Sequence, residues 1–494
     1  MRWISIVAAT FAAALAGLHD SGTAAGAGRL APSDATRQSI QARRFPLGEV
    51  VERVVASSDS TQSYALYLPS SYRADTGWPV LFVMDPGGRA VMALNLFRRG
   101  AERYGYIVLS SYGTRSDVTD DPNTPALQAM LTDAQLFFTI DSRRIYLAGF
   151  SGTARVGWIF ADRLRGYVSG LIGFGGGQPG GALLTVLSPE ETFAFFGGAG
   201  TTDFNYEEMR QLDSWLDRIG LPHRFEYFDG GHSWAPEEFC FRSLEWMELQ
   251  TMKMGRRPRD DAWMQAQLEE RLEVARALEA AGELYEAFIR YQAISEDFGG
   301  LLDVGDVAVK AAELERDRNV RRTVERMDDL AEWQRRQDDR FYEFLEDFRT
   351  TDRLPSLERS LRRLNIEDLQ RRAAETERPL DAQAAQRLLE HIFVRVAYYE
   401  PEDFLREGEA ERALGMVMIA DVIRPESPRV YLNLARAHAQ LGQVEQALQA
   451  LERVVAAGAV NAAFLEGDAY LEPLRGEPGY REIVERLEGN QGGA

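Results

Sequence analysis

The first half of the chain alternates between short apolar runs and longer stretches in which apolar residues recur every three or four positions. Short apolar runs bounded by turn-forming residues are typical of buried strands, and the longer pattern is typical of amphipathic helices. The short runs predict strands at residues 50–57, 63–68, 78–84, 106–110, 144–150, 170–174, 193–197 and 224–228. The amphipathic stretches predict helices at 122–138, 154–164, 206–219 and 236–253. An antiparallel start followed by alternating strands and helices predicts an α/β fold, a doubly wound and mostly parallel sheet covered on both faces.

The second half of the chain has a different pattern. After a charged segment at residues 256–261 no strand-like run recurs, and long amphipathic stretches predict an all-α region. A glycine followed five positions later by an alanine recurs at Gly282/Ala287, Gly408/Ala413 and Gly442/Ala447. The last two glycines are 34 residues apart, and Pro425 lies where a unit of that length ends. The pattern resembles tetratricopeptide repeats, each a helix–turn–helix that buries its apolar face against a neighbour.

The predicted repeat units lie at residues 268–298 and, in tandem, at 397–458, with a capping helix at 471–487. Gly282 and Gly408 are 126 residues apart, which is not a multiple of 34, so residues 306–396 are predicted to be helical but irregular. The resemblance implies a concave groove that binds a peptide or another protein. In the alternative interpretation, these helices pack on the first half of the chain and shape or shield its site.

One junction between a predicted strand and a predicted helix carries a serine in a sharp turn. The strand at 144–150 ends in the pattern Gly149-x-Ser151-x-Thr153, and a helical stretch starts at Ala154. Such a turn lifts the serine hydroxyl above the sheet edge, and the helix start points backbone N–H groups at developing negative charge. Small residues are needed there because the strand and the helix approach closely. Ser151 is therefore a candidate nucleophile, and the alternative is an ordinary Gly/Ser connection.

The candidate general base is found by elimination, because the chain has only five histidines. Three of them lie in a removable leader or in helical runs of the second half: His19, His391 and His438. His232 comes after the strand at 224–228, in a loop whose two glycines leave it free to reach a neighbouring strand. His223 opens that strand and is the weaker alternative, and its other interpretation is a residue that caps the sheet edge.

The third candidate is a carboxylate that holds the histidine in the correct tautomer and stabilises the imidazolium. Asp203 comes after the apolar strand at 193–197 and a turn of small residues, and it can also cap the next helix. Glu207 and Glu208 lie a turn further on, where acidic residues favour a helix start for electrostatic reasons alone. Asp229 is a lesser alternative, because it would have to fold back on its own loop.

The chain order Ser151, Asp203, His232 is characteristic of one fold among several that carry this triad. With these residues the sequence, from about residue 45 to residue 253, resembles the α/β-hydrolase superfamily, in particular small serine esterases that lack a large lid domain. The resemblance implies acyl transfer through an acyl-enzyme, with Ser151 as the nucleophile, His232 as the base and Asp203 as its partner. No metal or organic cofactor is expected, since the sequence lacks His-Glu-x-x-His, clustered Cys/His and Gly-x-x-x-x-Gly-Lys-Ser/Thr patterns.

The resemblance also implies an oxyanion hole. One donor is the N–H of Gly152, and the other comes from the loop after the third strand, where Gly87 or Gly88 is expected to supply it. This loop reads Asp-Pro-Gly-Gly and departs from the common His-Gly-Gly pattern. At the elbow, Thr153 replaces the more usual second glycine, and its β-branch is expected to crowd the turn and affect the rate.

Composition narrows the picture further. A net charge of −20 and a pI near 4.9 argue against nucleic acid as a partner. Residues 1–27 combine Arg2, an apolar run from residue 4 to 18 and an Ala-x-Ala ending at Ala27, which resembles a signal peptide. The run is short for a membrane span, so export to the periplasm or the medium is expected, with no stable membrane span after cleavage. The single cysteine, Cys240, is expected to be a buried small hydrophobe.

These observations divide the chain into a signal peptide at 1–27, a linker at 28–44, an α/β-hydrolase domain at 45–255, a linker at 256–264 and a tetratricopeptide-like domain at 265–490. The favoured function is an exported serine hydrolase, a carboxylesterase acting on small or medium acyl esters. A thioesterase or peptidase would use the same triad. In the alternative that involves no catalysis, the hydrolase fold is inactive and serves as a protein-interaction module.

Overall fold

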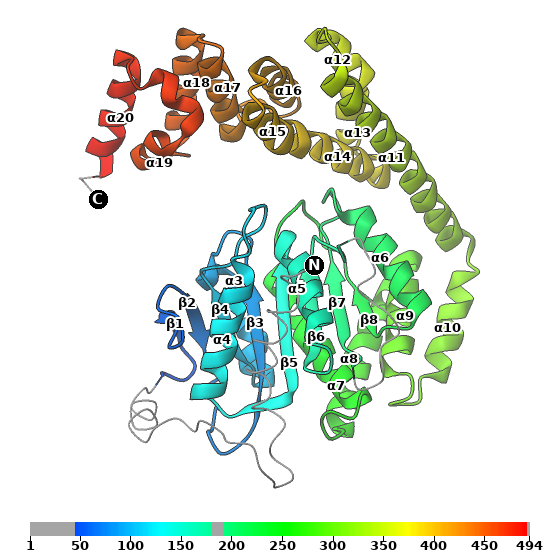
Figure 1. The fold of residues 1–494 in the computed structure, drawn as a ribbon. Coiled ribbons are helices and arrows are strands. Elements are labelled where there is room, and N and C mark those ends of the chain that lie inside the picture. Colours follow the sequence, from blue (N-terminus) through cyan, green and yellow to red (C-terminus); the bar gives the residue numbers. More distant parts are fainter. Residues whose placement is uncertain (1–44, 180–190, 492–494) are drawn as a thin grey trace. The chain divides into compact units, whose positions relative to one another are not determined.

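The structure is a computed structural model that describes residues 45–179 and 191–491 (Figure 1). The chain divides into two compact units, residues 1–324 and 325–494. The predicted signal peptide at 1–27 and the predicted linker at 28–44 lie outside the described residues. Within the described part, none of the helices combines the length and the apolar character that crossing a membrane requires.

The described part of the first unit is built on an eight-stranded sheet. Its strands are β1 (Val50–Val55), β2 (Ser63–Tyr67), β3 (Trp78–Met84), β4 (Ile107–Ser111), β5 (Ile140–Phe150), β6 (Val168–Phe174), β7 (Ala194–Gly198) and β8 (His223–Phe225). They lie in the order β1-β2-β4-β3-β5-β6-β7-β8, and β2 runs antiparallel to β1 and β4 while the other neighbours are parallel. Because parallel strands end at one edge, the loops after β3, β5, β6, β7 and β8 gather there.

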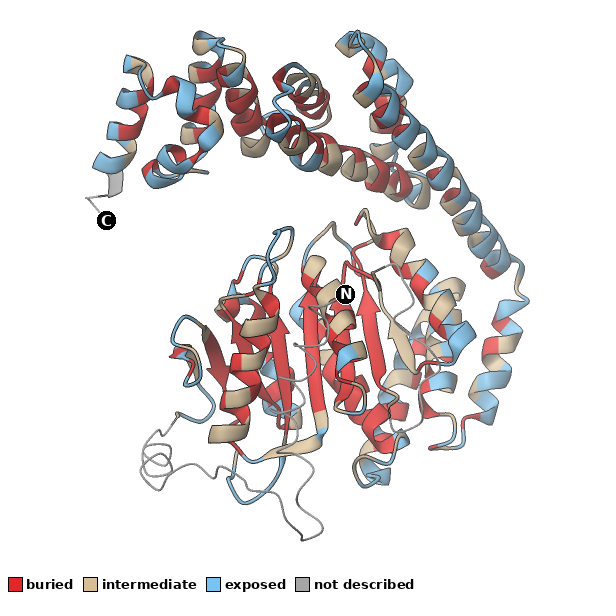
Figure 2. Cartoon of the chain, in the orientation of Figure 1, coloured by how far each residue is buried: buried red, intermediate tan, exposed pale blue. Residues whose placement is uncertain are grey.

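Helices cover both faces of the sheet (Figure 1). One face packs against α4 (Asn123–Phe137), α5 (Gly152–Arg163) and α6 (Tyr206–Ile219), and the other against α3 (Ala90–Tyr104) and α7 (Glu237–Lys253). In β3, Val80 and Phe82 belong to the first apolar layer, and Leu81 and Val83 belong to the second. Both faces of such a strand are buried, which explains its continuous apolar run. Figure 2 shows this burial along the central strands.

The predicted fold class is confirmed, since all eight predicted strands are present and the parallel sheet is covered on both faces. The predicted helices of this half correspond to α4, α5, α6 and α7. The sequence analysis did not identify α3. The buried face of α3 consists largely of alanines together with Leu94 and Phe97, and it gives a weak apolar signal although these residues are fully buried.

Three further helices belong to the first unit: α8 (Asp261–Ala280), α9 (Leu284–Phe298) and α10 (Gly305–Glu315). A linker was predicted at 256–264 and a second domain at 265–490, whereas the two compact units separate between residues 324 and 325. The difference arises because α7 is buried on nearly all sides from Ser243 to Met252. Leu249 and Met252 share an apolar cluster with residues of α8 and α9, a tertiary contact that no local pattern reveals.

The second unit is all-α, as predicted. It contains the main part of α11 (Arg318–Thr350) and then α12 (Leu357–Arg363), α13 (Ile366–Ala373), α14 (Pro379–Val394), the π-helical turn η2 (Arg395–Tyr399), α15 (Glu400–Arg406), α16 (Ala410–Ile423), α17 (Pro428–Gln440), α18 (Val444–Ala456), α19 (Ala462–Gly467), the 3₁₀ turn η3 (Ala469–Leu474) and α20 (Pro478–Gln491). Gly408 and Gly442 have φ values of 79° and 70° in the turns before α16 and α18. Such a conformation favours glycine, while Ala413 and Ala447 are fully buried at helix contacts.

The predicted capping helix at 471–487 is two elements instead of one, because the 3₁₀ turn η3 ends at Leu474 and α20 begins at Pro478. Proline is well suited to the first turn of a helix, where its missing N–H costs nothing.

Asp297 of α9 makes buried polar contacts with the sheet. Substituting it tests whether α9 is part of the first unit. Its buried carboxylate accepts from Arg224 of β8 at 2.7 Å, from Arg271 of α8 at 2.8 Å and from the Trp246 indole at 2.7 Å. Removing one partner of a buried ion pair leaves an uncompensated charge. We expect Asp297→Asn to lower the free energy of unfolding of the first unit by about 3–5 kcal/mol, measured from urea unfolding.

Glu296→Gln is the matched control, because Glu296 also pairs with Arg224, at 3.1 Å, but its side chain is 52% exposed. An exposed ion pair contributes about 0–1 kcal/mol. Equal losses in the two variants would show that the buried carboxylate does not hold α9 to the sheet.

Candidate active site

Ser151 lies on the turn between β5 and α5 in an unusual backbone conformation, with φ 53° and ψ −125°. The turn is tight, since a β-carbon on Gly149 would lie 2.5 Å from the carbonyl oxygen of Thr153. Three contacts hold the turn: the Ser151 N–H donates to the Phe174 carbonyl at 2.8 Å, and the Thr153 hydroxyl lies 2.6 Å from the Met84 carbonyl and 2.8 Å from that of Phe150. The hydroxyl of Thr153 therefore joins β3 to the turn. The sequence had suggested only that the β-branch of Thr153 crowds the turn.

The structure brings Ser151, His232 and Asp203 together although they lie on three separate loops. His232 Nε2 lies 2.9 Å from Ser151 Oγ. The other ring nitrogen, Nδ1, lies 2.9 Å and 3.0 Å from the two carboxylate oxygens of Asp203, which is fully buried. This geometry favours the tautomer in which Nδ1–H donates to Asp203 and Nε2 accepts from the serine hydroxyl.

Aromatic rings and backbone contacts fix the position of His232. Its ring contacts those of Phe150 and Phe204, with centroid distances of 4.7 Å and 4.3 Å. The loops after β7 and β8 are joined as well, because the Thr202 N–H and hydroxyl both lie within 2.9 Å of the Gly230 carbonyl oxygen. These contacts hold the imidazole with Asp203 at its Nδ1 and Ser151 at its Nε2.

Asp203 is also held from a second direction, since the Asn205 N–H donates to its Oδ1 at 2.8 Å at the start of α6. The alternatives to these residues lie elsewhere. Glu208 pairs with Arg155, Glu207 pairs with Arg210, and Asp229 is exposed.

Two glycines of the loop after β6, Gly175 and Gly176, lie against the candidate residues. A β-carbon on Gly176 would lie 2.3 Å from the carbonyl oxygen of Ser151, and one on Gly175 would lie 3.0 Å from Asp203 Oδ2 and 3.3 Å from His232. These two positions therefore admit only glycine if the three side chains are to meet. In the sequence, the only sign of this close packing is the run of glycines that follows the strand at 170–174.

The N–H groups expected to bind the oxyanion differ in whether they already have an acceptor within the protein. Among the described residues no acceptor takes the N–H of Gly152, which begins α5 and is free to bind a substrate oxygen. The N–H of Gly87 instead donates to Asp85 Oδ1 at 2.9 Å, and that of Gly88 donates to the Asp85 carbonyl at 3.0 Å. Both N–H groups thus bind Asp85 in this structure, and the role of Gly87 or Gly88 as an oxyanion donor stays a prediction.

Asp85 is a site residue that the sequence analysis missed. It is fully buried and also accepts from the Arg89 guanidinium at 2.9 Å and from the Trp234 indole at 2.8 Å. Although burial alone raises the pKa of Asp85, the hydrogen bonds from Arg89, Trp234 and the loop N–H groups hold this pKa below its usual value. Trp234 lies two residues after His232, so one carboxylate links the loop after β3 to the histidine loop.

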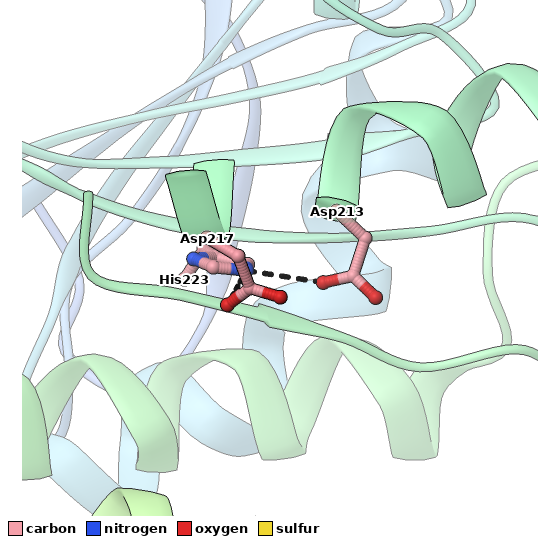
Figure 3. A group of neighbouring side chains, drawn as sticks. All are labelled: Asp213, Asp217 and His223. Carbon is pink, nitrogen blue, oxygen red and sulfur yellow. Dashed lines mark ion pairs between the residues drawn. The ribbon is translucent and has the colours of Figure 1, made fainter. Parts of the chain in front are cut away.

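His223 lies away from this cluster, at the start of β8, and forms a separate polar group with Asp213 and Asp217 of α6 (Figure 3). Its Nδ1 lies 2.6 Å from the Leu221 carbonyl oxygen, and its Nε2 lies 3.1 Å from Asp213 and 3.5 Å from Asp217. Burial lowers the pKa of His223, but the hydrogen bond to Asp213 and the nearby negative charges outweigh it and raise the pKa above 6.5. The group is therefore an ion pair at the sheet edge, in accord with the capping interpretation.

The remaining histidines and the cysteine have ordinary surroundings. His391 binds Asp338 and His438 binds Gln443, both in the second unit. Cys240 is fully buried, as expected, and burial raises the pKa of its thiol. His19 lies outside the described residues.

The first unit has the α/β-hydrolase fold that the sequence predicted. Its sheet is mostly parallel, the serine comes after a central strand on a sharp turn, and the acid and the histidine come after later strands. The second unit contains a tetratricopeptide repeat, because the family model of that name matches residues 404–465. No curated protein sequence matches the chain.

Solved structures of esterases are distantly similar to the chain. A ferulic acid esterase is 14% identical, with 40% of this chain and 97% of that one covered and a TM-score of 0.34. A substrate-bound fluorophosphonate-binding serine hydrolase of Staphylococcus aureus is 14% identical, with 41% and 99% covered and a TM-score of 0.34. An esterase of Pyrobaculum calidifontis is 14% identical, with 44% and 99% covered and a TM-score of 0.32.

The ion pair of His223 predicts a pH dependence of stability. A raised pKa in the folded state means that the stabilisation is complete below the unfolded pKa of about 6.5 and is lost as the pH rises through the folded value. We expect the melting temperature of His223→Gln to lie furthest below that of the natural protein near pH 6, with the gap narrowing toward pH 9. His438→Gln is the control, because His438 contacts Gln443 and has no carboxylate partner among the described residues. A gap for His223→Gln that widens with pH would contradict the ion pair.

Proposed function

We propose that this chain, which combines an α/β-hydrolase fold with a tetratricopeptide repeat, is a serine hydrolase that cleaves carboxylic esters. The observation that carries the proposal is the continuous contact from Asp203 through His232 to Ser151, with 2.9 Å at each step. A serine hydroxyl is a weak nucleophile until an adjacent base takes its proton, and the base needs an oriented partner. Both conditions are met by these three side chains.

In the proposed reaction Ser151 Oγ attacks the ester carbonyl carbon while His232 Nε2 takes the hydroxyl proton. The resulting imidazolium donates its Nδ1–H to Asp203, whose buried carboxylate stabilises the positive charge. As the tetrahedral intermediate collapses, His232 returns the proton to the departing alcohol and the acyl group stays on Ser151. Water then attacks the acyl-enzyme, with the same histidine as base, and releases the carboxylate.

The N–H of Gly152 is the proposed donor to the oxyanion, because it begins α5 directly after the nucleophile and has no other acceptor among the described residues. Loss of one such donor costs about 2.7–4 kcal/mol of transition-state stabilisation in a measured case. Thioesters and amides pass through the same tetrahedral intermediate, so the triad alone does not select among them. Esters are proposed because the sequence resembles small serine esterases, and because an alkoxide needs less help from the acid than the amine of an amide does.

We also propose that the tetratricopeptide repeat binds a protein or peptide partner, since stacked repeats of this kind form a binding surface. Export is proposed from the sequence pattern at residues 1–27. Mass spectrometry of protein purified from the periplasm or the medium tests it, because a chain that still carries residues 1–27 would contradict cleavage.

Substitution of the nucleophile and the base tests the proposed reaction. With a panel of p-nitrophenyl esters, thioesters and peptide amides, we expect Ser151→Ala and His232→Ala each to lower kcat by about 10⁴- to 10⁶-fold on the esters. Ser233→Ala is the control, because among the described residues the only hydrogen bond of this neighbouring hydroxyl is to the Trp234 carbonyl. Substantial ester hydrolysis by Ser151→Ala, or a natural protein without activity on any ester, would contradict the proposal.

Asp85→Asn tests whether the link between the two loops matters for catalysis. An amide cannot accept from all the donors that the carboxylate binds, so both loops are expected to shift and kcat to fall by about 10²-fold with little change in KM. Asp133→Asn is the matched control, since Asp133 is equally buried and accepts from Ser57 and Tyr64 away from the triad. It should lower stability without lowering kcat. Equal kcat losses would show that Asp85 acts only through stability.

A further inference from the structure

A cavity lies in the first unit, away from the triad. Its volume is about 390 Å³, and it is bounded by residues of α3, α7, α8 and α9 and of the outer strands β7 and β8. Its strand residue Phe196 belongs to the apolar layer on the α3 and α7 side of the sheet. None of Ser151, Asp203 and His232 lines it.

Guanidinium groups dominate the walls of this cavity. Six arginines line it, together with five carboxylates, in a chain whose net charge is −20. The arginines are Arg99, Arg103, Arg224, Arg242, Arg271 and Arg290. Ion pairs with the lining carboxylates explain the presence of only some of these arginines.

Four of the arginines have carboxylate partners within the walls. Arg99 binds Glu238 at 2.6 Å and Arg242 binds Glu226 at 2.6 Å. Arg224 and Arg271 share Asp297, at 2.7 Å and 2.8 Å, in the contact that joins α9 to the sheet. Arg271 also binds Glu245, at 2.9 Å, so four of the five lining carboxylates are paired with lining arginines.

Arg103 and Arg290 are left over, because neither has a carboxylate partner among the described residues. They come from different helices, α3 and α9, yet line the same cavity. A third donor is also unused, since the Nε of Arg224 is buried and has no hydrogen-bond partner in the described part of the chain. The remaining lining carboxylate, Glu270, and Arg103 are both exposed to water, whereas Arg290 is half-buried. An anion in the cavity would give an acceptor to Arg290 and to the buried Nε of Arg224, and Arg103 can reach it from the solvent side.

The same cavity has an apolar part. Phe196 and Ile294 in its lining are only 1% and 2% exposed, so its accessible apolar surface comes from the half-buried rings of Tyr104 and Phe241 and from Val274, which is 50% exposed. An inorganic anion would leave these surfaces unused, whereas an apolar body attached to the anionic group would cover them.

We propose that this cavity binds a small organic acid, whose carboxylate is held by Arg103 and Arg290 and whose apolar body lies on Tyr104, Phe241 and Val274. Guanidinium groups suit this task because they stay charged and donate pairs of hydrogen bonds in the geometry that a carboxylate accepts. The ligand lies between the sheet and the α8–α9 pair, so its binding stabilises the first unit against unfolding. The site is independent of the triad and does not rest on the proposed esterase activity.

Titration calorimetry of the full-length protein tests the proposal with three probes at constant ionic strength: benzoate, inorganic phosphate and benzyl alcohol. Benzoate carries both the charge and the apolar body, and each of the others carries one of them. We expect saturable one-to-one binding of benzoate, at least tenfold tighter than that of either other probe, and a melting temperature that rises with benzoate concentration. Binding of benzyl alcohol or phosphate as tight as that of benzoate would overturn the proposed ligand class.

Variants locate the binding. Arg290→Ala and Arg103→Ala should each weaken benzoate binding by about tenfold, and Val274→Trp should abolish it by filling the rim without removing a charge. Arg276→Ala is the matched control, because Arg276 lies on α8 but outside the cavity, with a side chain that is 59% exposed. Ser151→Ala should bind benzoate as the natural protein does. Unchanged affinity in Arg290→Ala and Arg103→Ala, or equal loss in Arg276→Ala, would place the binding elsewhere and overturn the site.

Discussion

The backbone of Ser151, held at φ 53° and ψ −125°, is the constraint on which the site depends. A non-glycine residue in such a conformation costs about 1–3 kcal/mol and persists only where its surroundings enforce it. Here contacts on both sides of Ser151 hold its backbone in this conformation. Gly149 and Gly176 leave no room for a side chain, and the N–H of Ser151 is bound to the Phe174 carbonyl on the neighbouring strand. The parallel pairing of β5 with β6 therefore sets where the hydroxyl points.

The other parts of the site are positioned by the same edge of the sheet. The loop after β7 supplies Asp203, the loop after β8 supplies His232, and hydrogen bonds from Thr202 to Gly230 join the two loops. Asp85 then ties the histidine loop to the loop after β3 through Trp234. Ser151, Asp203 and His232 come from three different loops, but the loops are joined to one another as well as to the strands. Such pre-organisation is what acyl transfer requires of a protein.

Much of the fold and of the triad could be predicted from the sequence for physical reasons. Buried strands such as β3 must be apolar on both faces, and this leaves an uninterrupted run that is easily recognised. The pattern Gly149-x-Ser151 and the small number of histidines identified residues that the structure brings into contact. The oxyanion loop could not be predicted in the same way, because the direction of the Gly87 N–H depends on the side chain of Asp85, two residues earlier. Likewise, the packing of α8 and α9 on α7 depends on tertiary contacts such as those of Asp297, which leave no local signature.

Reaction with a fluorophosphonate, followed by peptide mass spectrometry of the purified protein, tests the central claim most directly. A fluorophosphonate phosphonylates a serine only when a base activates its hydroxyl, so the measurement reports the nucleophile without reference to any substrate. The account predicts one modified residue, Ser151, and no labelling after His232→Ala. A folded protein that stays unlabelled, or a label on another serine, would contradict the account.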